Sequence, residues 1–353
     1  TVIVGPNASG KTNILESLYL LSTGKSFKAR LEEEMVSYNE EIARVKGAIV
    51  DGSGGEKGGT NLEVVLTRGE ITIGTNPSKV EKVARKKLLV NGIAKRLIDF
   101  AGNFKIVLFG PWDLDLVTAS PSLRRNFLDT VLSQTDREYR RASLSYEKGL
   151  RQRNKLLYRI REEGISRSQL LFWNQLLIKN GDYIARRREE FIEYTNNTNN
   201  PISKAWPFDY KKVNTNYQLE YDKSVISETR LDQYKMEEVA AATTLVGPHR
   251  DDIIFKIKNE KLKMKNFERE LARYGSRGEQ RMGVLWLKLA ELAYIENETG
   301  EKPTLLLDDI FSELDHEHRG VVMDAAKGQQ TIITTADPHF LEGFEKVEKI
   351  KLS

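Results

Sequence analysis

The residues with the clearest chemical pattern lie near the start of the chain, where Gly5-Pro-Asn-Ala-Ser-Gly-Lys-Thr12 follows the apolar run Val2–Val4. The spacing G-x-x-x-x-G-K-[ST] predicts a loop whose backbone N–H groups, lysine and threonine hydroxyl hold nucleotide phosphates and Mg²⁺. A helical apolar pattern follows, so that a positive helix N-terminus faces the same anion. The alternative is an ordinary Gly-rich turn, which the strand before and the helix after disfavour. The predicted phosphate-binding residues are Gly5, Pro6, Asn7, Ala8, Ser9, Gly10, Lys11, Thr12 and Asn13.

A pair of carboxylates far along the chain supplies the expected partner of this loop. Three leucines precede Asp308 and Asp309, and such a run predicts a strand that is buried on both faces. We expect Asp308 and Thr12 to hold Mg²⁺, and Asp309 to act on the attacking water as polariser or base. Taken alone, an aspartate pair after a strand is more typical of a helix cap or a turn.

A second anion-binding pattern stands before this strand, in the segment Tyr274–Arg281. Ser276 and Gly278 open an amphipathic helix, and a Ser and a Gly at a helix N-terminus can form an anion nest. If the phosphate loop encloses its own nucleotide, this nest serves the nucleotide of a second subunit. Because Lys11 and Asp308 are separated by nearly the whole chain, a large insert is expected within one nucleotide-binding sheet.

These motifs resemble the ABC-type ATPases, and more closely the RecF family of recombination-repair ATPases, which is related to SMC proteins. Residues 276–280 resemble the signature motif, and residues 305–315 resemble a Walker B strand running into a D-loop. Residues 114–129 and 244–252 are similar to RecF segments that are rarer in other ABC ATPases. The resemblance implies an α/β, ABC-type (SMC-like) P-loop ATPase head with an inserted helical lobe, in which Asp315 helps to align a partner's site.

The sequence departs from the family pattern at several positions. Asp309 stands where transporters carry Glu, which fits RecF and implies slow hydrolysis. The position of the transporter switch histidine is taken by residues 334–337. No glutamine matches the Q-loop of the family, and the corresponding region is expected around residues 111–113. The chain starts inside the strand before the phosphate loop, so we expect a fragment or a misplaced start.

Three parts are expected along the chain. Residues 1–120 form the β-rich N-terminal half of ATPase lobe I, with strands at 43–50 and 62–67 around a glycine-rich hairpin loop at 51–59. Residues 121–235 form a helical arm, lobe II, with about three helices between 122 and 197. Residues 236–353 form the C-terminal half of lobe I. The basic run 82–87 is expected to be a solvated turn, and short strands are expected at 208–210 and 217–221.

The helical arm concentrates basic residues, and a basic face there favours contact with DNA phosphates. The alternative is a solvated helix face in which arginines pair with glutamates. The segment 244–252 leaves a second question open. His249 and Arg250 either contact DNA or a subunit interface, or cap a turn and pair with Asp251 or Asp252. The DNA candidates are Arg140, Arg141, Arg151 and Arg153.

Composition limits the other possibilities. The 353 residues include no cysteine, which excludes disulfides, thiolate zinc sites and cysteine nucleophiles within this sequence, and the 4 scattered histidines show no metal-ligand spacing. No apolar run is long enough to span a membrane, so a soluble chain is expected, and its need for ATP favours the cytoplasm. A net charge of +4 means that any DNA site depends on where the charges are placed.

The predicted function is a slow, DNA-dependent ATPase that uses ATP and Mg²⁺. Two subunits close head-to-tail around ATP as a homodimeric clamp. The RecF resemblance implies that the clamp binds double-stranded and gapped DNA and works with RecO and RecR in loading the RecA recombinase. One alternative is another ABC-type ATPase, such as a transporter motor subunit. The other is a non-hydrolysing, ATP-gated DNA-binding module.

Overall fold

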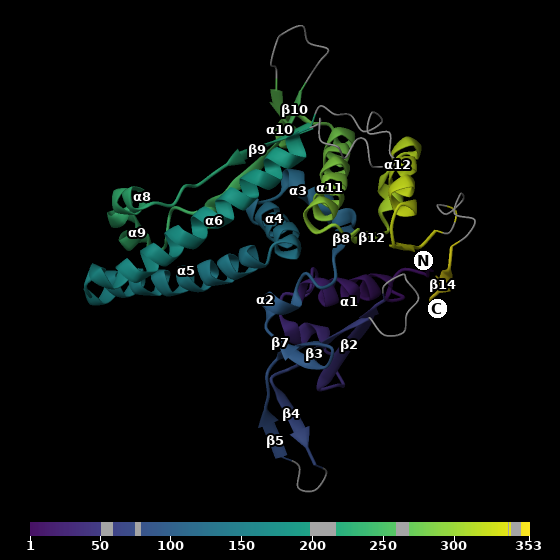
Figure 1. Cartoon of the computed structure of the whole chain (residues 1–353), viewed down its shortest axis with the longest axis horizontal. Coiled ribbons are helices and arrows are strands. Elements are labelled where there is room, and N and C mark those ends of the chain that lie inside the picture. The colour runs from purple at the N-terminus through teal and green to yellow at the C-terminus, as the bar shows by residue number, and fades with distance from the viewer. Residues whose placement is uncertain (51–58, 75–78, 198–216, 259–267, 338, 340–346) are drawn as a thin grey trace. The chain divides into compact units, whose positions relative to one another are not determined.

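The computed structural model describes residues 1–353 except 51–58, 75–78, 198–216, 259–267, 338 and 340–346 (Figure 1). The chain divides into two compact units. Unit 1 comprises residues 1–111, 302–315 and 326–353, and unit 2 comprises residues 112–301 and 316–325. The two ends of the chain therefore build one unit, and the segment between them builds most of the other. The finer division at residues 120 and 235 stays a prediction.

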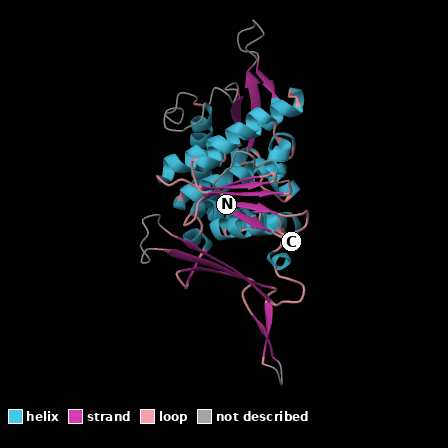
Figure 2. Cartoon of the chain, turned by 90° about the vertical axis from the view of Figure 1, so that its right-hand side faces the viewer, coloured by secondary structure: helices cyan, strands magenta, loops and turns pink. Residues whose placement is uncertain are grey.

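A parallel five-stranded sheet forms the centre of unit 1, and its strand order is β14-β1-β13-β12-β8 (Figure 2). Helix α1 (Lys11–Thr23) packs against it, because Leu15 shares a buried cluster with three side chains of the sheet, those of Ile106, Leu108 and Leu306. All five residues of β12 are buried, which confirms the predicted leucine-rich strand. The strands are β1 (Val2–Val4), β8 (Ile106–Phe109), β12 (Thr304–Asp308), β13 (Thr331–Thr335) and β14 (Lys349–Lys351).

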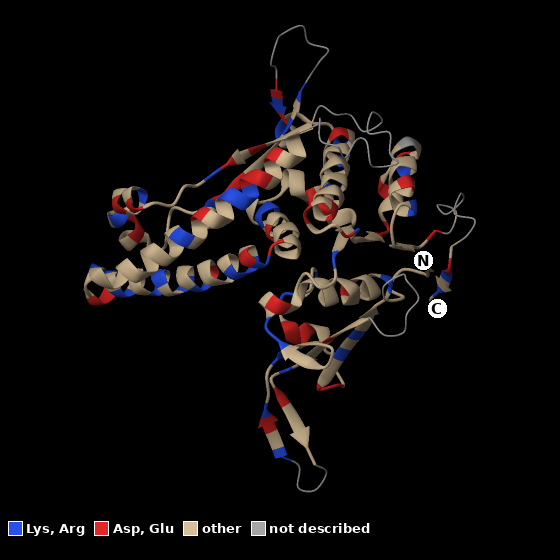
Figure 3. Ribbon diagram, in the orientation of Figure 1, with Lys and Arg blue, Asp and Glu red and all other residues tan. Residues whose placement is uncertain are grey.

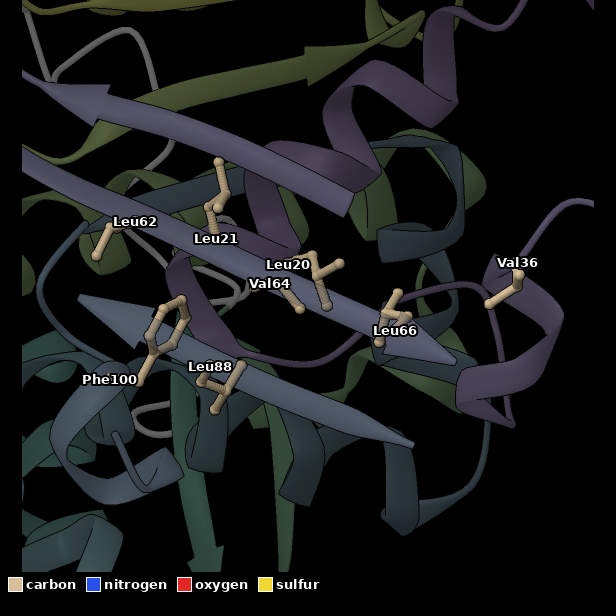
Figure 4. Close-up of a cluster of buried hydrophobic side chains, with 8 residues drawn as sticks. All are labelled: Leu20, Leu21, Val36, Leu62, Val64, Leu66, Leu88 and Phe100. Carbon is tan, nitrogen blue, oxygen red and sulfur yellow. The ribbon is translucent and has the colours of Figure 1, made fainter. Parts of the chain in front are cut away.

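An antiparallel sheet of order β2-β3-β6-β7 forms a second layer in unit 1. Alternate residues of β3 point inward, and Leu62, Val64 and Leu66 share a core with Leu20 and Leu21 of α1 (Figure 4). The strands are β2 (Ile42–Ile49), β3 (Thr60–Thr67), β6 (Lys86–Val90) and β7 (Ile93–Lys95), and the short helices beside them are η1 (Glu32–Met35) and α2 (Leu97–Phe100).

The β-rich prediction for this region is confirmed for both expected strands, with one correction. The run 82–87 is not a turn throughout, because Lys82 ends β5 (Lys79–Lys82) and Lys86 begins β6. Strand β5 pairs with β4 (Glu70–Ile73) in a two-stranded ribbon. Residues 51–58 of the loop expected at 51–59 lie outside the described residues, and the antiparallel strands β2 and β3 stand on either side of this loop in the sequence.

Unit 2 is built around the predicted helical region. Helices α5 (Arg137–Glu163) and α6 (Leu171–Asn196) form a long antiparallel pair, and α4 (Pro121–Thr135) precedes them (Figure 1). Phe127 and Val131 of α4 are buried, whereas Leu123 is 41 % exposed and lies outside the core. The remaining helices are α3 (Asp115–Thr118), α8 (Glu228–Gln233), α9 (Lys235–Ala241), α10 (Leu271–Tyr274), α11 (Arg277–Thr299) and α12 (His316–Lys327).

A three-stranded antiparallel sheet of order β11-β10-β9 completes unit 2. The strand expected at 217–221 is confirmed as part of β9, and the one expected at 208–210 lies outside the described residues. The strands are β9 (Tyr217–Asp222), β10 (Asp252–Lys258) and β11 (Glu268–Glu270), and the short 3-10 helices of the chain's later part are η2 (Pro111–Leu114), η3 (Arg167–Leu170), η5 (Pro248–Arg250) and η6 (Ile310–Glu313).

Candidate nucleotide site

The loop between β1 and α1 is tightly folded. A Cβ atom placed on Gly5 would lie 2.6 Å from the Ser9 hydroxyl and 3.0 Å from the Cβ of Leu352, so only glycine fits between the loop and the end of β14. Ala8 and Gly10 both adopt left-handed backbone conformations, with φ of 67° and 93°. The loop therefore curls back toward the start of α1, as the glycine spacing predicts.

Lys11 is the first residue of α1, and its side chain turns back over the loop. Its ammonium donates hydrogen bonds to the carbonyl oxygens of Gly5, at 2.7 Å, and Pro6, at 2.8 Å. The residue is only 8 % exposed. The sequence thus brings one cation to the position where the loop, the helix N-terminus and the sheet meet.

The loop threonine and the carboxylate of β12 are in direct contact. The Thr12 hydroxyl donates a hydrogen bond of 2.9 Å to Oδ2 of Asp308, although the two residues are 296 positions apart. The other carboxylate oxygen, Oδ1, accepts a hydrogen bond from the Thr334 hydroxyl of β13. A hydroxyl and a carboxylate are hard oxygen ligands of the kind that Mg²⁺ prefers. The residues present therefore fit a magnesium site beside the phosphate loop.

Asp309 follows at the point where β12 ends. Its backbone is left-handed, with φ of 49°, and its N–H donates to the Thr334 carbonyl at 3.1 Å. Burial raises the pKa of its carboxyl above the usual value, while a hydrogen bond from the Ala336 N–H and the Lys11 ammonium act in the opposite direction. Asp309 thus lies in the same part of unit 1 as Lys11 and Asp308, and its left-handed backbone marks the point where the chain leaves the extended conformation of β12.

Ser276 and Gly278 lie at the exposed N-terminus of α11 in unit 2. The Ser276 hydroxyl accepts from the Glu279 N–H at 3.2 Å, and the Ser276 N–H donates to the Glu279 carboxylate at 2.7 Å. A Cβ atom on Gly278 would meet nothing within 4 Å. The first N–H groups of a helix lack acceptors within the helix, so this end presents donors to an external group. The serine side chain itself serves as a helix cap, and the sequence signal for this role was the capping-box spacing of Ser276 and Glu279.

Asp315 lies between two helices, and the segment near which the Q-loop is expected forms a short 3-10 helix. Asp315 is exposed between η6 and α12. Residues 111–114 form η2, and Asp113 lies 3.9 Å from the Lys288 ammonium of α11.

The four candidate DNA arginines occupy different environments on α5. Arg151 is exposed and pairs with Glu147 four residues before it, and Arg141 pairs with Glu138. Arg140 donates to the Ser133 carbonyl. Arg153 is 2 % exposed, and its guanidinium bonds to Glu238 at 2.6 Å and to the Thr244 hydroxyl at 2.8 Å. Because this guanidinium is buried and bonded within unit 2, we leave Arg153 out of the DNA-binding proposal.

The segment 244–252 forms the turn η5 and anchors neighbouring helices. His249 lies within this turn, and its ring has Nε2 3.1 Å from the Thr244 carbonyl and Nδ1 2.9 Å from the Tyr146 hydroxyl. The two aspartates pair with more distant arginines: Arg188 donates to Asp251 at 2.9 Å, and Arg124 to Asp252 in a bidentate pair. Of the alternatives left open by the sequence, neither a side-chain cap of the turn nor a pairing with the adjacent aspartates is found in this described segment; His249 and Arg250 both bond to the Thr244 carbonyl instead.

Comparison with known proteins identifies the family. The family model described as the RecF/RecN/SMC N-terminal domain matches residues 1–353. Proteins named DNA replication and repair protein RecF from Herpetosiphon aurantiacus and Thermomicrobium roseum are each 34 % identical to the chain, over 96 % of it and 88 % of their own length. The chain belongs to the RecF family.

A solved structure supports the same assignment at the level of the fold. The recombination mediator protein RecF with ATP, of the RecFOR pathway, is 30 % identical to the chain and superposes with a TM-score of 0.80, over 100 % of this chain and 89 % of that one. The predicted fold class is confirmed: the chain has the SMC/RecF type of ABC ATPase head. RecF is an ABC-type ATP-binding family. Among the described residues, no helix is both long and apolar enough to cross a membrane.

One residue of the site was given no role by the sequence. Thr334 stands in the position noted for the absent switch histidine, and its side chain donates to the carboxylate of Asp308. The signal was a threonine at the end of the strand that pairs with the Asp308 strand. Its use depends on the register Asp308 to Thr334, which no local pattern shows.

Proposed function

We propose that the chain binds ATP and Mg²⁺ in unit 1 and hydrolyses the nucleotide slowly. The observation that carries the proposal is the hydrogen bond between Thr12 and Asp308, at 2.9 Å, beside the Lys11 ammonium. ATP phosphates in the loop offer Lys11 charged acceptors in place of two carbonyl oxygens. Thr12 and Asp308 would hold magnesium, which would neutralise charge on the phosphates. Asp309 takes the proton of the attacking water or orients it, and its raised pKa suits a base.

Two copies of the chain form the ATP-dependent homodimer. The exposed N-terminus of α11, with Ser276 and Gly278, binds the γ-phosphate held by the partner, and Asp315 helps to align that site. The N–H groups at this helix end and the open space around Gly278 support the role. Because the nucleotide stabilises only the closed pair, its hydrolysis removes that stabilisation.

The dimer acts on DNA in replication and repair. It binds double-stranded and gapped DNA, and it works with RecO and RecR to load the RecA recombinase. Support comes from the names of the relatives, which are DNA replication and repair proteins, and from the RecFOR pathway of the solved RecF structures. Exposed basic residues along α5, Arg141 and Arg151 among them, supply contacts for phosphates (Figure 3).

Sedimentation with and without ATP, on the wild type and Lys11→Met, tests this function. We expect Lys11→Met to lose ATP binding and the ATP-dependent shift from monomer to dimer. The control is Lys95→Met, which removes an exposed lysine of β7. Dimers that persist unchanged in Lys11→Met contradict the proposed site.

The substitution Asp309→Asn tests hydrolysis separately from binding. We expect ATP binding and dimers to survive while the rate falls about 100-fold, the lower end of the contribution of a general base. Equal rates in the two proteins instead favour the non-hydrolysing module, and a chain that dimerises without responding to gapped DNA favours another ABC-type motor.

A further inference from the structure

The two oxygens of the Asp308 carboxylate have different hydrogen-bond donors. Oδ2 faces the phosphate loop and accepts from the Thr12 hydroxyl at 2.9 Å. Oδ1 faces the neighbouring strand β13 and accepts from the Thr334 hydroxyl. Asp308 and Thr334 occupy paired positions of parallel strands, and they are 4 % and 0 % exposed. The carboxylate therefore lies between a residue of the loop and a residue of the sheet.

Thr334 is held firmly in place. Its backbone carbonyl accepts the Asp309 N–H at 3.1 Å, and its hydroxyl also lies 3.4 Å from the Leu307 carbonyl. Threonine is β-branched, which restricts its χ1 rotation, and water has no access to a fully buried side chain. Rotation of the Asp308 carboxylate would therefore break a buried hydrogen bond to a charged oxygen, one of the stronger kinds in proteins.

We propose that Thr334 is a positioning residue for Asp308. By occupying Oδ1, it keeps Oδ2 turned toward Thr12, where the oxygen ligands for Mg²⁺ converge. This inference rests on the proposed ATP and Mg²⁺ function. Residues that orient a metal ligand in this way typically change metal affinity or activity about 10- to 100-fold when they are replaced.

The alternative is a purely structural hydroxyl that stabilises the sheet. Thr331 of the same strand offers the matched comparison, because its hydroxyl is also buried, but within the described part of the chain its partners are backbone carbonyls, that of Ala326 at 2.9 Å and that of Gln329 at 3.2 Å. If Thr334 only stabilises the strand, the two threonines should respond alike to the loss of the hydroxyl.

The experiment compares Thr334→Val, Thr334→Ser and Thr331→Val. One readout is the affinity for a fluorescent ATP analogue, measured in EDTA and across a Mg²⁺ titration. The second is Mn²⁺ binding followed by electron paramagnetic resonance in the presence of ADP. We expect Thr334→Val to weaken Mn²⁺ binding and to shift the Mg²⁺ midpoint upward about 10- to 100-fold, with the EDTA affinity unchanged. Thr334→Ser and Thr331→Val should behave as the wild type does.

Three results overturn the inference: a wild-type metal response of Thr334→Val, an equal metal defect in Thr334→Ser, or an equal defect in Thr331→Val. If Thr334→Val does not fold, Thr334→Cys, with a weak S–H donor of similar size, takes its place and should show an intermediate shift.

Lys11→Met and Asp308→Asn separate the two proposals. If both bind nucleotide and metal normally, the proposed function fails; if both lose binding while Thr334→Val is normal, only the role of Thr334 fails.

Discussion

His249, in the segment 244–252 that resembles RecF proteins, shows how a single residue contributes to folding. With its Nε2 protonated, the ring donates to the Thr244 carbonyl, and Nδ1 accepts from the Tyr146 hydroxyl. Burial lowers the pKa of the imidazole to about 4, although the Thr244 carbonyl acts in the opposite direction. The folded protein therefore keeps this ring neutral at pH values where the unfolded chain binds a proton.

A pH dependence of stability follows from this difference. The folded pKa lies below the unfolded value of 6.5, so the contribution of His249 is complete above pH 6.5 and is lost as the pH falls toward 4, by up to about 3 kcal/mol. Urea denaturation at several pH values measures it. We expect His249→Gln to flatten the loss of stability in this range and His316→Gln, at an exposed position, to leave it unchanged. A wild-type slope in His249→Gln contradicts the assignment.

Arg151 and Arg153 mark the limit of residue-level prediction. They have the same side chain and stand two positions apart in one helix, yet Arg151 is exposed and Arg153 is 2 % exposed. The orientation of α5 about its axis is set by its packing on α6 and by Glu238 of α9, which is 85 residues away. Composition indicated a basic helix, but only the packing shows which arginines face water. The same holds for Thr334, whose role depends on strand register.

At the scale of elements, close approach is made possible by a glycine in α6. A Cβ atom on Gly181 would lie 2.7 Å from Ile226, 3.2 Å from the Tyr146 ring and 3.3 Å from the Pro248 ring. Gly320 of α12 contrasts with it, because a Cβ atom there would meet nothing within 4 Å. The two glycines are both helical, and only one of them is required by packing.

Substitution by alanine should therefore have opposite effects at these two positions. Overpacking at Gly181 costs about 1–3 kcal/mol, which exceeds the gain in helix propensity. Gly320→Ala gains only the propensity, about 0.5–1 kcal/mol. Thermal unfolding of both variants gives the signs directly. If Gly181→Ala is as stable as Gly320→Ala, the contacts of α6 are looser than the structure indicates.

Elements with strong local patterns could be predicted from the sequence, and the others could not. The consecutive leucines of β12 correctly indicated a strand, because a strand buried on both faces is apolar throughout. The apolar residues of α4 to α6 correctly indicated helices, because a helix buried on one face repeats its apolar positions about every 3.6 residues. The run 82–87 was misjudged because its charges suggested a turn, whereas Lys86 belongs to β6 and ion-pairs with Glu32. Pairing of β6 with β3 in the sheet, and the ion pair from Lys86 to η1, override local composition.

At the scale of the whole molecule, the chain combines the proposed nucleotide site, built from residues far apart in the sequence, with a long inserted unit. The sequence predicted that Thr12 and Asp308 act at the same site, because a phosphate loop needs a carboxylate at the end of a neighbouring strand. The insert carries the surface that we assign to DNA. On its helix α5, Lys148, Arg151 and Lys155 are exposed at i, i+3 and i+7, a spacing that places them on one face.

Salt dependence of DNA affinity tests this face. Lys148 and Lys155 have no acidic partner among the described residues, so each is free to displace a counterion from DNA. The logarithm of the association constant should fall linearly with the logarithm of salt concentration, with a slope of about −0.9 for each phosphate contact. We expect the double variant Lys148→Gln, Lys155→Gln to reduce the magnitude of the slope by about 2.

A matched control separates this local effect from the loss of net charge. Lys235→Gln removes an exposed lysine of α9 that pairs with Asp232 at 2.9 Å, and it should leave the slope within error of the wild type. Because counterion release counts contacts rather than total charge, the position of the lysine decides the outcome. If the slope is unchanged in the double variant, the DNA binds another surface. If the magnitude of the slope falls equally in the control, the effect of the α5 lysines comes from net charge and not from their position.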